Sequence, residues 1–208
     1  MGRRSDHTRS ELAALFVSEG WQHLAAVGLA RFSAREVAKC AGYTIGSIHN
    51  VFGNTEGLLL AINARTLALW ADHVRTRLAA PGAEPIETLV RAYFDFATAN
   101  PLCWMAIFQQ HLADDRPAPA WYRAAVAELM SIVAGGIARA LPEADAERIQ
   151  SLTRSLVATV HGHCMFSLVH TFDLLGETDP VGAALTRVRE ALDAARRADP
   201  RAGDLPQR

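Results

Sequence analysis

The segment "AREVAKCAGYTIGSIHNVFGNTEGLL", residues 34–59, decides the fold of the N-terminal part of this chain. Ser33 followed three residues later by Glu36 forms the pattern of a capping box, which predicts a helix beginning at Ala34. Gly42 is expected to end that helix, because glycine adopts the left-handed conformation without a side-chain penalty. A second short helix is then predicted over residues 45–51, and Asn54 or Thr55 would cap a long third helix.

The second of these helices is predicted to be apolar on one side only. Its helical period places Ile48 and Phe52 toward the core and Gly46, Ser47 and Asn50 on the opposite side. Small outward residues allow a backbone to approach a groove floor and phosphates, and two short helices across a tight turn form a helix-turn-helix. The alternative is an ordinary helical hairpin in a bundle, because such hairpins are common.

The pattern of spaced residues separates these alternatives. Ser33 is followed by "REVA" and "AG" at 35–38 and 41–42, then by "GSIH" at 46–49, Phe52 and "EGLL" at 56–59. Residues 33–62 thereby resemble the N-terminal DNA-binding module of the TetR/AcrR family of transcriptional regulators. The "VHG" at 160–162 also resembles a Trp-His-Gly signature in the C-terminal domain of one subgroup of that family.

The resemblance implies which positions contact DNA. Arg35 stands where members place a base-contacting arginine, whose fork suits guanine O6 and N7. Departures from the family pattern are Ile45 in place of a common polar residue, His49 in place of tyrosine and Thr55 in place of a frequent lysine. The positions implied to bind DNA are Arg35, Thr44, Ile45, Gly46, Ser47, His49, Asn50 and Thr55.

The positive charge of the predicted DNA-binding module is small. The whole chain carries a net charge of -1, and residues 1–60 hold six basic against five acidic residues, a net of +1. The phosphate contribution to affinity should therefore be modest and its salt dependence shallow, unless Arg3, Arg4 and Arg9 add to it from the N-terminal arm.

Composition and breakers define the rest of the chain. Its 208 residues are half hydrophobic, strand patterns are nearly absent, and apolar residues recur at three and four positions, which predicts an all-α fold of about nine helices, the first three of them short. We expect a helix-turn-helix domain over residues 1–54 that continues into the helix starting near 55. A larger domain should cover 55–198, and residues 199–208 should be a disordered tail. With no signal peptide, no membrane span and three cysteines in apolar contexts, a cytoplasmic protein is expected.

The larger domain is implied by the resemblance to bind a small effector. Aromatic residues are frequent in its predicted helices, and most should be core residues. Some could instead line an apolar cavity with a few polar groups. The candidate effector-binding residues are Trp104, Phe108, His111, His161, Met165, Phe166 and His170.

Other chemistry finds little support. His161 and His163 project about 200° apart on a helix and cannot chelate one ion together, and a lone pair of His161 and Cys164 is more often a core contact. No nucleophile elbow, phosphate loop or carboxylate pair is present. We therefore predict no enzymatic activity, no cofactor and no metal site.

The last two long helices, near 145–174 and 180–197, offer an apolar face that pairs two subunits or closes the core of one. The face comprises Ile149, Leu152, Leu156, Val160, Leu168, Val181, Leu185, Val188 and Leu192. Together with this face, the resemblance implies a homodimeric repressor that binds a palindromic double-stranded DNA operator and is released by an apolar or aromatic effector. The rival interpretations are a helical small-molecule binding protein with a vestigial DNA-binding head, and a metal- or haem-containing helical enzyme.

Overall fold

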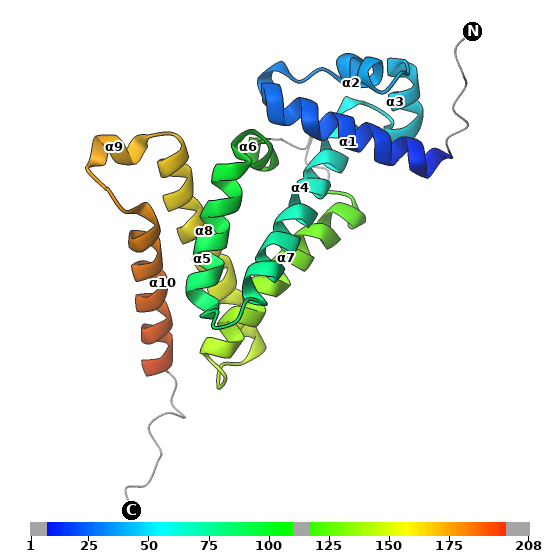
Figure 1. The fold of residues 1–208 in the computed structure, drawn as a ribbon. Coiled ribbons are helices and arrows are strands. Elements are labelled where there is room, and N and C mark those ends of the chain that lie inside the picture. Colours follow the sequence, from blue (N-terminus) through cyan, green and yellow to red (C-terminus); the bar gives the residue numbers. More distant parts are fainter. Residues whose placement is uncertain (1–7, 110–116, 199–208) are drawn as a thin grey trace, which may run out of the picture. The chain divides into compact units, whose positions relative to one another are not determined.

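The computed structural model describes residues 8–109 and 117–198, and all regular structure within them is helical (Figure 1). The expected all-α fold is confirmed. The helices are α1 Arg9–Val27, η1 Leu29–Arg31 (a 3-10 helix), α2 Ala34–Cys40, α3 Ile45–Phe52, α4 Thr55–Leu78, α5 Pro85–Ala99, α6 Pro101–Gln109, α7 Ala120–Ala140, α8 Ala146–Leu168, α9 Thr171–Leu175 and α10 Pro180–Arg197. None of them is long and apolar enough to cross a membrane.

The helices differ from expectation at two places. The first helix is 19 residues long rather than short, because a complete capping box at Thr8 and Glu11 starts it well before the helix-turn-helix. The helix predicted over 145–174 is divided: α8 ends at Leu168, and His170 takes a left-handed conformation with φ 59° before the short α9. The expected tail at 199–208 lies outside the described residues.

The chain forms two compact units, residues 1–69 with 100–126 and residues 70–99 with 127–208. Both α4 and α7 pass from one unit into the other. The boundary therefore falls inside α4 rather than at its first residue. The functional division predicted at residue 55 stays a prediction.

Unit 1 is organised around one apolar cluster. Phe16 of α1, Ile48 of α3 and Leu58 of α4 are completely buried in it, and Val37 of α2 is almost so. The ring of Phe16 also makes an edge contact with the ring of Phe52, with centroids 6.4 Å apart. Because every helix of the N-terminal module contributes to this cluster, the orientation of α3 is fixed by packing.

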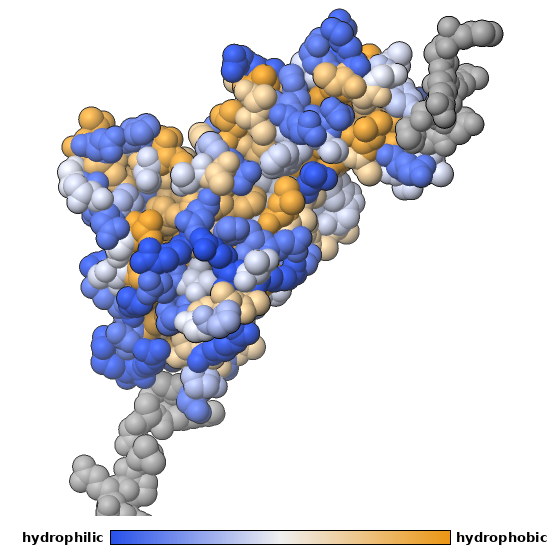
Figure 2. Space-filling view, in the orientation of Figure 1, coloured by the Kyte–Doolittle hydropathy of each residue, from blue (hydrophilic) through white to orange (hydrophobic). Residues whose placement is uncertain are grey.

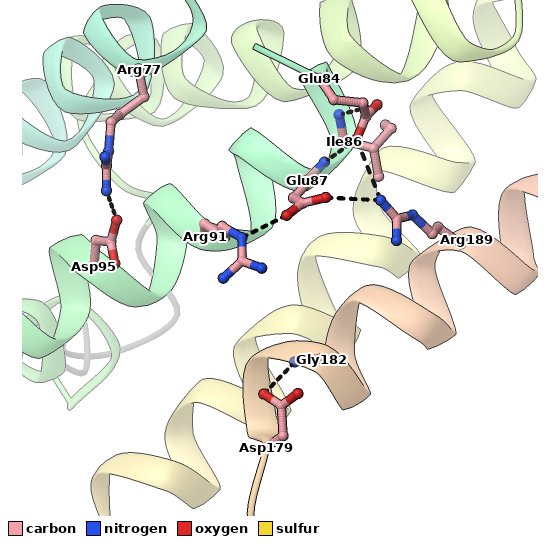
Figure 3. A network of polar contacts seen from close by, with 9 residues as sticks. All are labelled: Arg77, Glu84, Ile86, Glu87, Arg91, Asp95, Asp179, Gly182 and Arg189. Atoms are coloured by element: carbon pink, nitrogen blue, oxygen red, sulfur yellow. Dashed lines mark hydrogen bonds and ion pairs between the residues drawn. The ribbon is translucent and has the colours of Figure 1, made fainter. Parts of the chain in front are cut away.

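Unit 2 packs α5, α8 and α10 together. The apolar faces of α8 and α10 are used mainly inside the unit, because Ile149, Leu156, Val160, Leu185, Val188 and Leu192 are all buried. Most of the face that was expected either to pair two subunits or to close the core of one is thus buried within the unit, and its part in pairing stays a prediction. Around it, exposed arginines bridge helices: Arg189 of α10 donates to Glu87 of α5 at 3.0 Å, and Arg77 of α4 pairs with Asp95 (Figure 3).

Candidate nucleic-acid interface and effector cavity

The turn between α2 and α3 has the geometry expected from its glycine. Gly42 adopts φ 78°, and the Tyr43 amide donates to the Ala38 carbonyl at 2.8 Å, which closes the end of α2. At the start of α2, the Ser33 hydroxyl accepts from the Glu36 amide at 3.4 Å. Only half of the expected capping box therefore forms, because the Ser33 amide donates to Nε2 of His23 at 3.3 Å instead of to the Glu36 carboxylate. This bond ties α2 to α1.

Helix α3, the candidate DNA-recognition helix, exposes its small side chains on the surface of the unit. Gly46 and Asn50 are exposed, Ser47 is half-buried and Ile48 is fully buried. Thr44 is the N-cap residue but makes no capping hydrogen bond; its hydroxyl lies 3.4 Å from the Ser47 hydroxyl. Two hydroxyls are therefore held side by side at the start of α3, where they can reach an external acceptor or donor.

Arg9 has a structural role that the sequence did not reveal. Its guanidinium donates to the carbonyls of Asn50 and Val51, at 3.4 and 3.3 Å. These carbonyls lie at the C-terminal end of α3, where a cation is favourable. Arg9 thus ties α1 to the recognition helix, while Arg3 and Arg4 lie outside the described residues.

Unit 1 brings the predicted DNA-binding residues to the α2–α3–α4 surface. Arg35, Thr44, Gly46, His49 and Asn50 are exposed, whereas Ile45, Ser47 and Thr55 are half-buried. At the start of α4, Asn54 caps the helix by accepting from the Gly57 amide at 2.8 Å. No predicted position is removed into the core, so all eight can be reached from outside unit 1.

The predicted effector residues divide between the units. Trp104 and Phe108 belong to unit 1, where Trp104 is completely buried and Phe108 is 44% exposed. His161, Met165, Phe166 and His170 belong to unit 2, and His111 lies outside the described residues. His170 is exposed and its Nδ1 lies 3.0 Å from a carboxylate oxygen of Asp173.

Inside unit 2 are two small apolar cavities of about 40 and 30 Å³. They have four lining residues in common, Leu89, Tyr93, Val133 and Val157. Of the six predicted effector residues that the structure describes, none lines either cavity. The predicted residues are mainly aromatic residues and histidines, whereas the cavity walls are mainly aliphatic and resemble ordinary core in sequence.

One polar contact lies beside the cavities. The Tyr93 hydroxyl is 2.9 Å from Nδ1 of His161, which joins α5 to α8. Burial lowers the pKa of His161. Burial also raises the pKa of the Cys164 thiol to about 12, so that thiol is protonated near neutrality. Among the described residues, no group of three or more His, Cys, Asp or Glu could hold a metal ion.

The exposed surface of unit 2 carries an apolar patch where α8 ends and α9 follows. Phe166 and Val169 are 44% and 47% exposed, and Leu174 and Leu175 reach 88% and 65%. Figure 2 shows hydrophobic surface at this α9 end of the unit. We call these four residues the α9 patch; such a concentration of exposed apolar side chains is typical of an interaction surface.

A helix-turn-helix with an accessible recognition helix, followed by a larger helical region, is the architecture of a DNA-binding transcriptional regulator. Residues 16–62 match the sequence pattern of bacterial regulatory proteins of the tetR family, and residues 86–200 match the tetracyclin repressor-like C-terminal domain. The second match alone spans more than half of the chain. The protein belongs to the TetR family of transcriptional regulators.

Solved structures share this fold at low sequence identity. A protein of unknown function from Rhodococcus sp. RHA1 has a TM-score of 0.70 and 17% identity, with 93% of this chain and 98% of the other covered. A tetR-family transcriptional regulator from Streptomyces coelicolor has a TM-score of 0.66 and 17% identity, with 98% and 87% covered. The multidrug binding protein EbrR, complexed with imidazole, has a TM-score of 0.61 and 20% identity, with 91% and 96% covered. No curated protein matches the sequence significantly.

Proposed function

We propose that this protein is a cytoplasmic one-component repressor that binds a palindromic operator as a homodimer and leaves it when a small effector binds. The observation that carries the proposal is the exposed side of α3, which is poor in bulky side chains while its other side is pinned to Phe16 and Leu58. A recognition helix held in this way can enter a major groove without first reorganising. We assign the protein no catalytic activity and no cofactor.

The proposed contacts follow the side-chain chemistry. Arg35 reads a guanine through its two-pronged guanidinium, and Ile45 packs on a thymine methyl. Thr44, Asn50 and Thr55 donate to phosphates and fix the register of the helix. Gly46 and Ser47 permit the close approach, and His49 contacts backbone or base.

The α9 patch supports the homodimer. Since the buried faces of α8 and α10 are used within the unit, a second copy is proposed to cover Phe166, Val169, Leu174 and Leu175 instead. Two-fold pairing through one patch is self-complementary and brings two recognition helices to one DNA molecule. The half-sites would then lie one turn of DNA apart (about 34–36 Å) or a multiple of it.

The proposed effector acts by population shift. It binds more tightly to the arrangement of the dimer that does not fit the operator, and DNA binds the other. The printed name and ligand of EbrR, a multidrug binding protein complexed with imidazole, support small-molecule binding by this fold. Of the effector residues predicted from sequence, His161 keeps the strongest support, because it contacts Tyr93 in the cavity wall.

A second candidate function is a small-molecule binding protein with a vestigial DNA-binding head. The net charge of only +1 over residues 1–60 favours it. Lys39 adds little, because its ammonium lies 3.8 Å from the Glu36 carboxylate. The two proposed functions differ in whether the protein binds a specific DNA fragment and retards it in a gel.

Gel retardation with Arg35→Ala tests the function. The fragments are selected from random DNA by the wild-type protein, and the variant should lose specific retention at concentrations that saturate the wild type, while its helical circular dichroism is unchanged. One lost base contact costs about 1–3 kcal/mol per head, or about 5- to 150-fold in affinity. Arg154→Ala, which removes an exposed arginine from unit 2, is the matched control and should bind normally.

Two outcomes would count against the proposal. If no fragment is enriched by the wild-type protein, the binding-protein alternative is favoured. If Arg35→Ala retains the selected fragments as well as the wild type does, Arg35 does not read bases.

A further inference from the structure

Resting on the proposed function, we infer that the effector is a small, uncharged and mainly hydrocarbon molecule with one hydrogen-bond acceptor, bound in the joined apolar cavities of unit 2 beside Trp70 and Tyr93. The residues predicted from sequence do not line this site. The inference rests on the uncharged cavity walls, the wall residues that the two cavities share, the buried indole N–H of Trp70 and the position of Trp70 on α4.

The walls exclude charge. Neither cavity is lined by an Asp, Glu, Lys, Arg or His side chain among the described residues. An ion entering such a space would lose its hydration without gaining a partner, which is far more costly than the entry of a neutral molecule. The walls are formed by Ile86, Leu89, Val90, Tyr93, Val133, Ile137, Leu156, Val157, Val160 and Val188 around the larger cavity, and by Trp70, Val74, Leu129 and Met130 with the four shared residues around the smaller one.

The two cavities can become one. They have Leu89, Tyr93, Val133 and Val157 in common in their walls, and the three aliphatic side chains among these can move without breaking a polar contact. Volumes of about 40 and 30 Å³ are each smaller than the 150 Å³ or so of an apolar cavity that takes up benzene. The ligand must therefore be small and must displace these side chains as it enters.

Trp70 supplies the expected polar contact. Its side chain lines the smaller cavity and is only 5% exposed, and its indole Nε1 is buried with no hydrogen-bond acceptor in the part of the chain that the structure describes. A buried donor without an acceptor is costly, and a ligand acceptor would remove that cost. The indole is held in place by Phe96, stacked at 5.7 Å between centroids, and by an edge contact with Tyr93 at 4.6 Å.

The helices that line the site connect it to the function. Trp70 and Val74 lie on α4, whose first turns carry Leu58 and Ile62 into the core of unit 1. A ligand that changes the packing around Trp70 therefore acts on the same continuous helix that supports the recognition module. This is a direct route for the population shift proposed above.

Three isosteric probes test the inference on the protein alone, without DNA. Acetophenone has the shape and the acceptor, cumene replaces the carbonyl oxygen by a methyl group, and benzoate adds a charge. The readouts are methyl NMR shifts of Leu89, Val133 and Val157 and the indole N–H shift of Trp70, assigned with Trp70→Phe. Acetophenone should saturate these shifts at millimolar concentration or below, cumene should bind at least threefold more weakly, and benzoate should cause no shift.

Two sets of variants complete the test. The double variant Val133→Ile with Val157→Ile fills the cavities and should weaken acetophenone binding at least fivefold. Val181→Ile, on the half-buried surface of α10, is the matched control and should leave binding unchanged. Trp70→Phe should abolish the preference for acetophenone over cumene, while Trp121→Phe should preserve it.

The outcomes separate this inference from the proposed function. Benzoate binding equal to that of acetophenone would overturn the neutral class, and equal binding of cumene would overturn the acceptor. If no probe shifts the cavity methyl groups and the filled variant is merely more stable, the cavities are packing defects and the inference fails. The probe experiments contain no DNA, so their outcome does not depend on whether the protein binds DNA in the gel-retardation experiment.

Discussion

At the scale of single residues, two glycines of the DNA-binding module have opposite reasons to be glycine. A Cβ at Gly57 would collide with the carbonyl oxygen of Phe52, which is backbone and cannot move aside. A Cβ at Gly46 would meet only the Thr44 hydroxyl, at an ordinary distance of 3.6 Å. The fold thus requires glycine at position 57, whereas no contact inside the fold requires it at position 46. The absence of a side chain at Gly46 is therefore a property of the proposed DNA-facing surface.

Alanine substitutions should separate these roles. Gly57→Ala should lower the free energy of unfolding by about 2 kcal/mol or more, since the close approach of the α3–α4 connection has to open. Gly46→Ala should keep or raise stability by about 0.5 kcal/mol, because alanine is the better helix former, yet weaken operator binding by placing a methyl group at the groove. Urea unfolding and gel retardation on both variants provide the check. A Gly46→Ala protein that binds DNA normally would contradict the close-approach role.

At the scale of elements, the helix-turn-helix could be predicted from sequence because its signals are local. Ser33, Gly42 and Asn54 mark helix ends through their own backbone or side-chain chemistry, and each does so in the structure. The helix break at His170 has no such mark, because a non-glycine residue adopts φ 59° there.

The cavities of unit 2 could not be predicted from the sequence, for a different reason. Helical periodicity places Leu156 on an apolar face, but it does not show which neighbour covers that face. A cavity is the space left over after side chains from α4, α5, α7, α8 and α10 have packed, and it depends on their volumes together. Aromatic residues such as Trp104 therefore do not mark these cavities, since Trp104 fills space in unit 1.

Two partly buried histidines, His161 of α8 and His73 of α4, should make the stability of the protein depend on pH. Burial lowers the pKa of His161, and burial together with the nearby Arg77 lowers that of His73. A histidine with a lowered pKa binds protons more readily in the unfolded chain, so stability is retained above the unfolded pKa of about 6.5 and lost as the pH falls below it.

Urea unfolding at pH 7.5 and 5.0 measures this dependence. On acidification, each histidine should lower the free energy of unfolding by less than about 1 kcal/mol, because both are only partly buried and solvent screens the effect. The double variant His73→Gln with His161→Gln should lose less stability than the wild type between these pH values. Equal losses would show that neither histidine is held neutral by the fold.

At the scale of the whole molecule, the distribution of charge sets how the regulator finds DNA. The chain is nearly neutral, with a net charge of -1, and its N-terminal module has little excess of cations. Two of those cations are already engaged: Arg9 with the carbonyl groups of α3, and Lys39 with Glu36. Long-range attraction to DNA should consequently be weak, and most of the affinity should come from short-range contacts made by α3.

The salt dependence of operator binding measures this balance. If Arg9, Arg31 and Lys39 of each head exchange their present partners for phosphates, a dimer engages about six phosphates, and the slope of log K against log salt concentration should be near -5. Fluorescence anisotropy between about 50 and 300 mM salt gives that slope, and Arg154→Ala, which lies far along the chain from the module, should not change it. A slope near -10 would require phosphate contacts from residues beyond the described module, with the N-terminal Arg3 and Arg4 as the first candidates. A truncation that removes both arginines would then return the slope toward -5, because it deletes the extra phosphate contacts and leaves α3 intact.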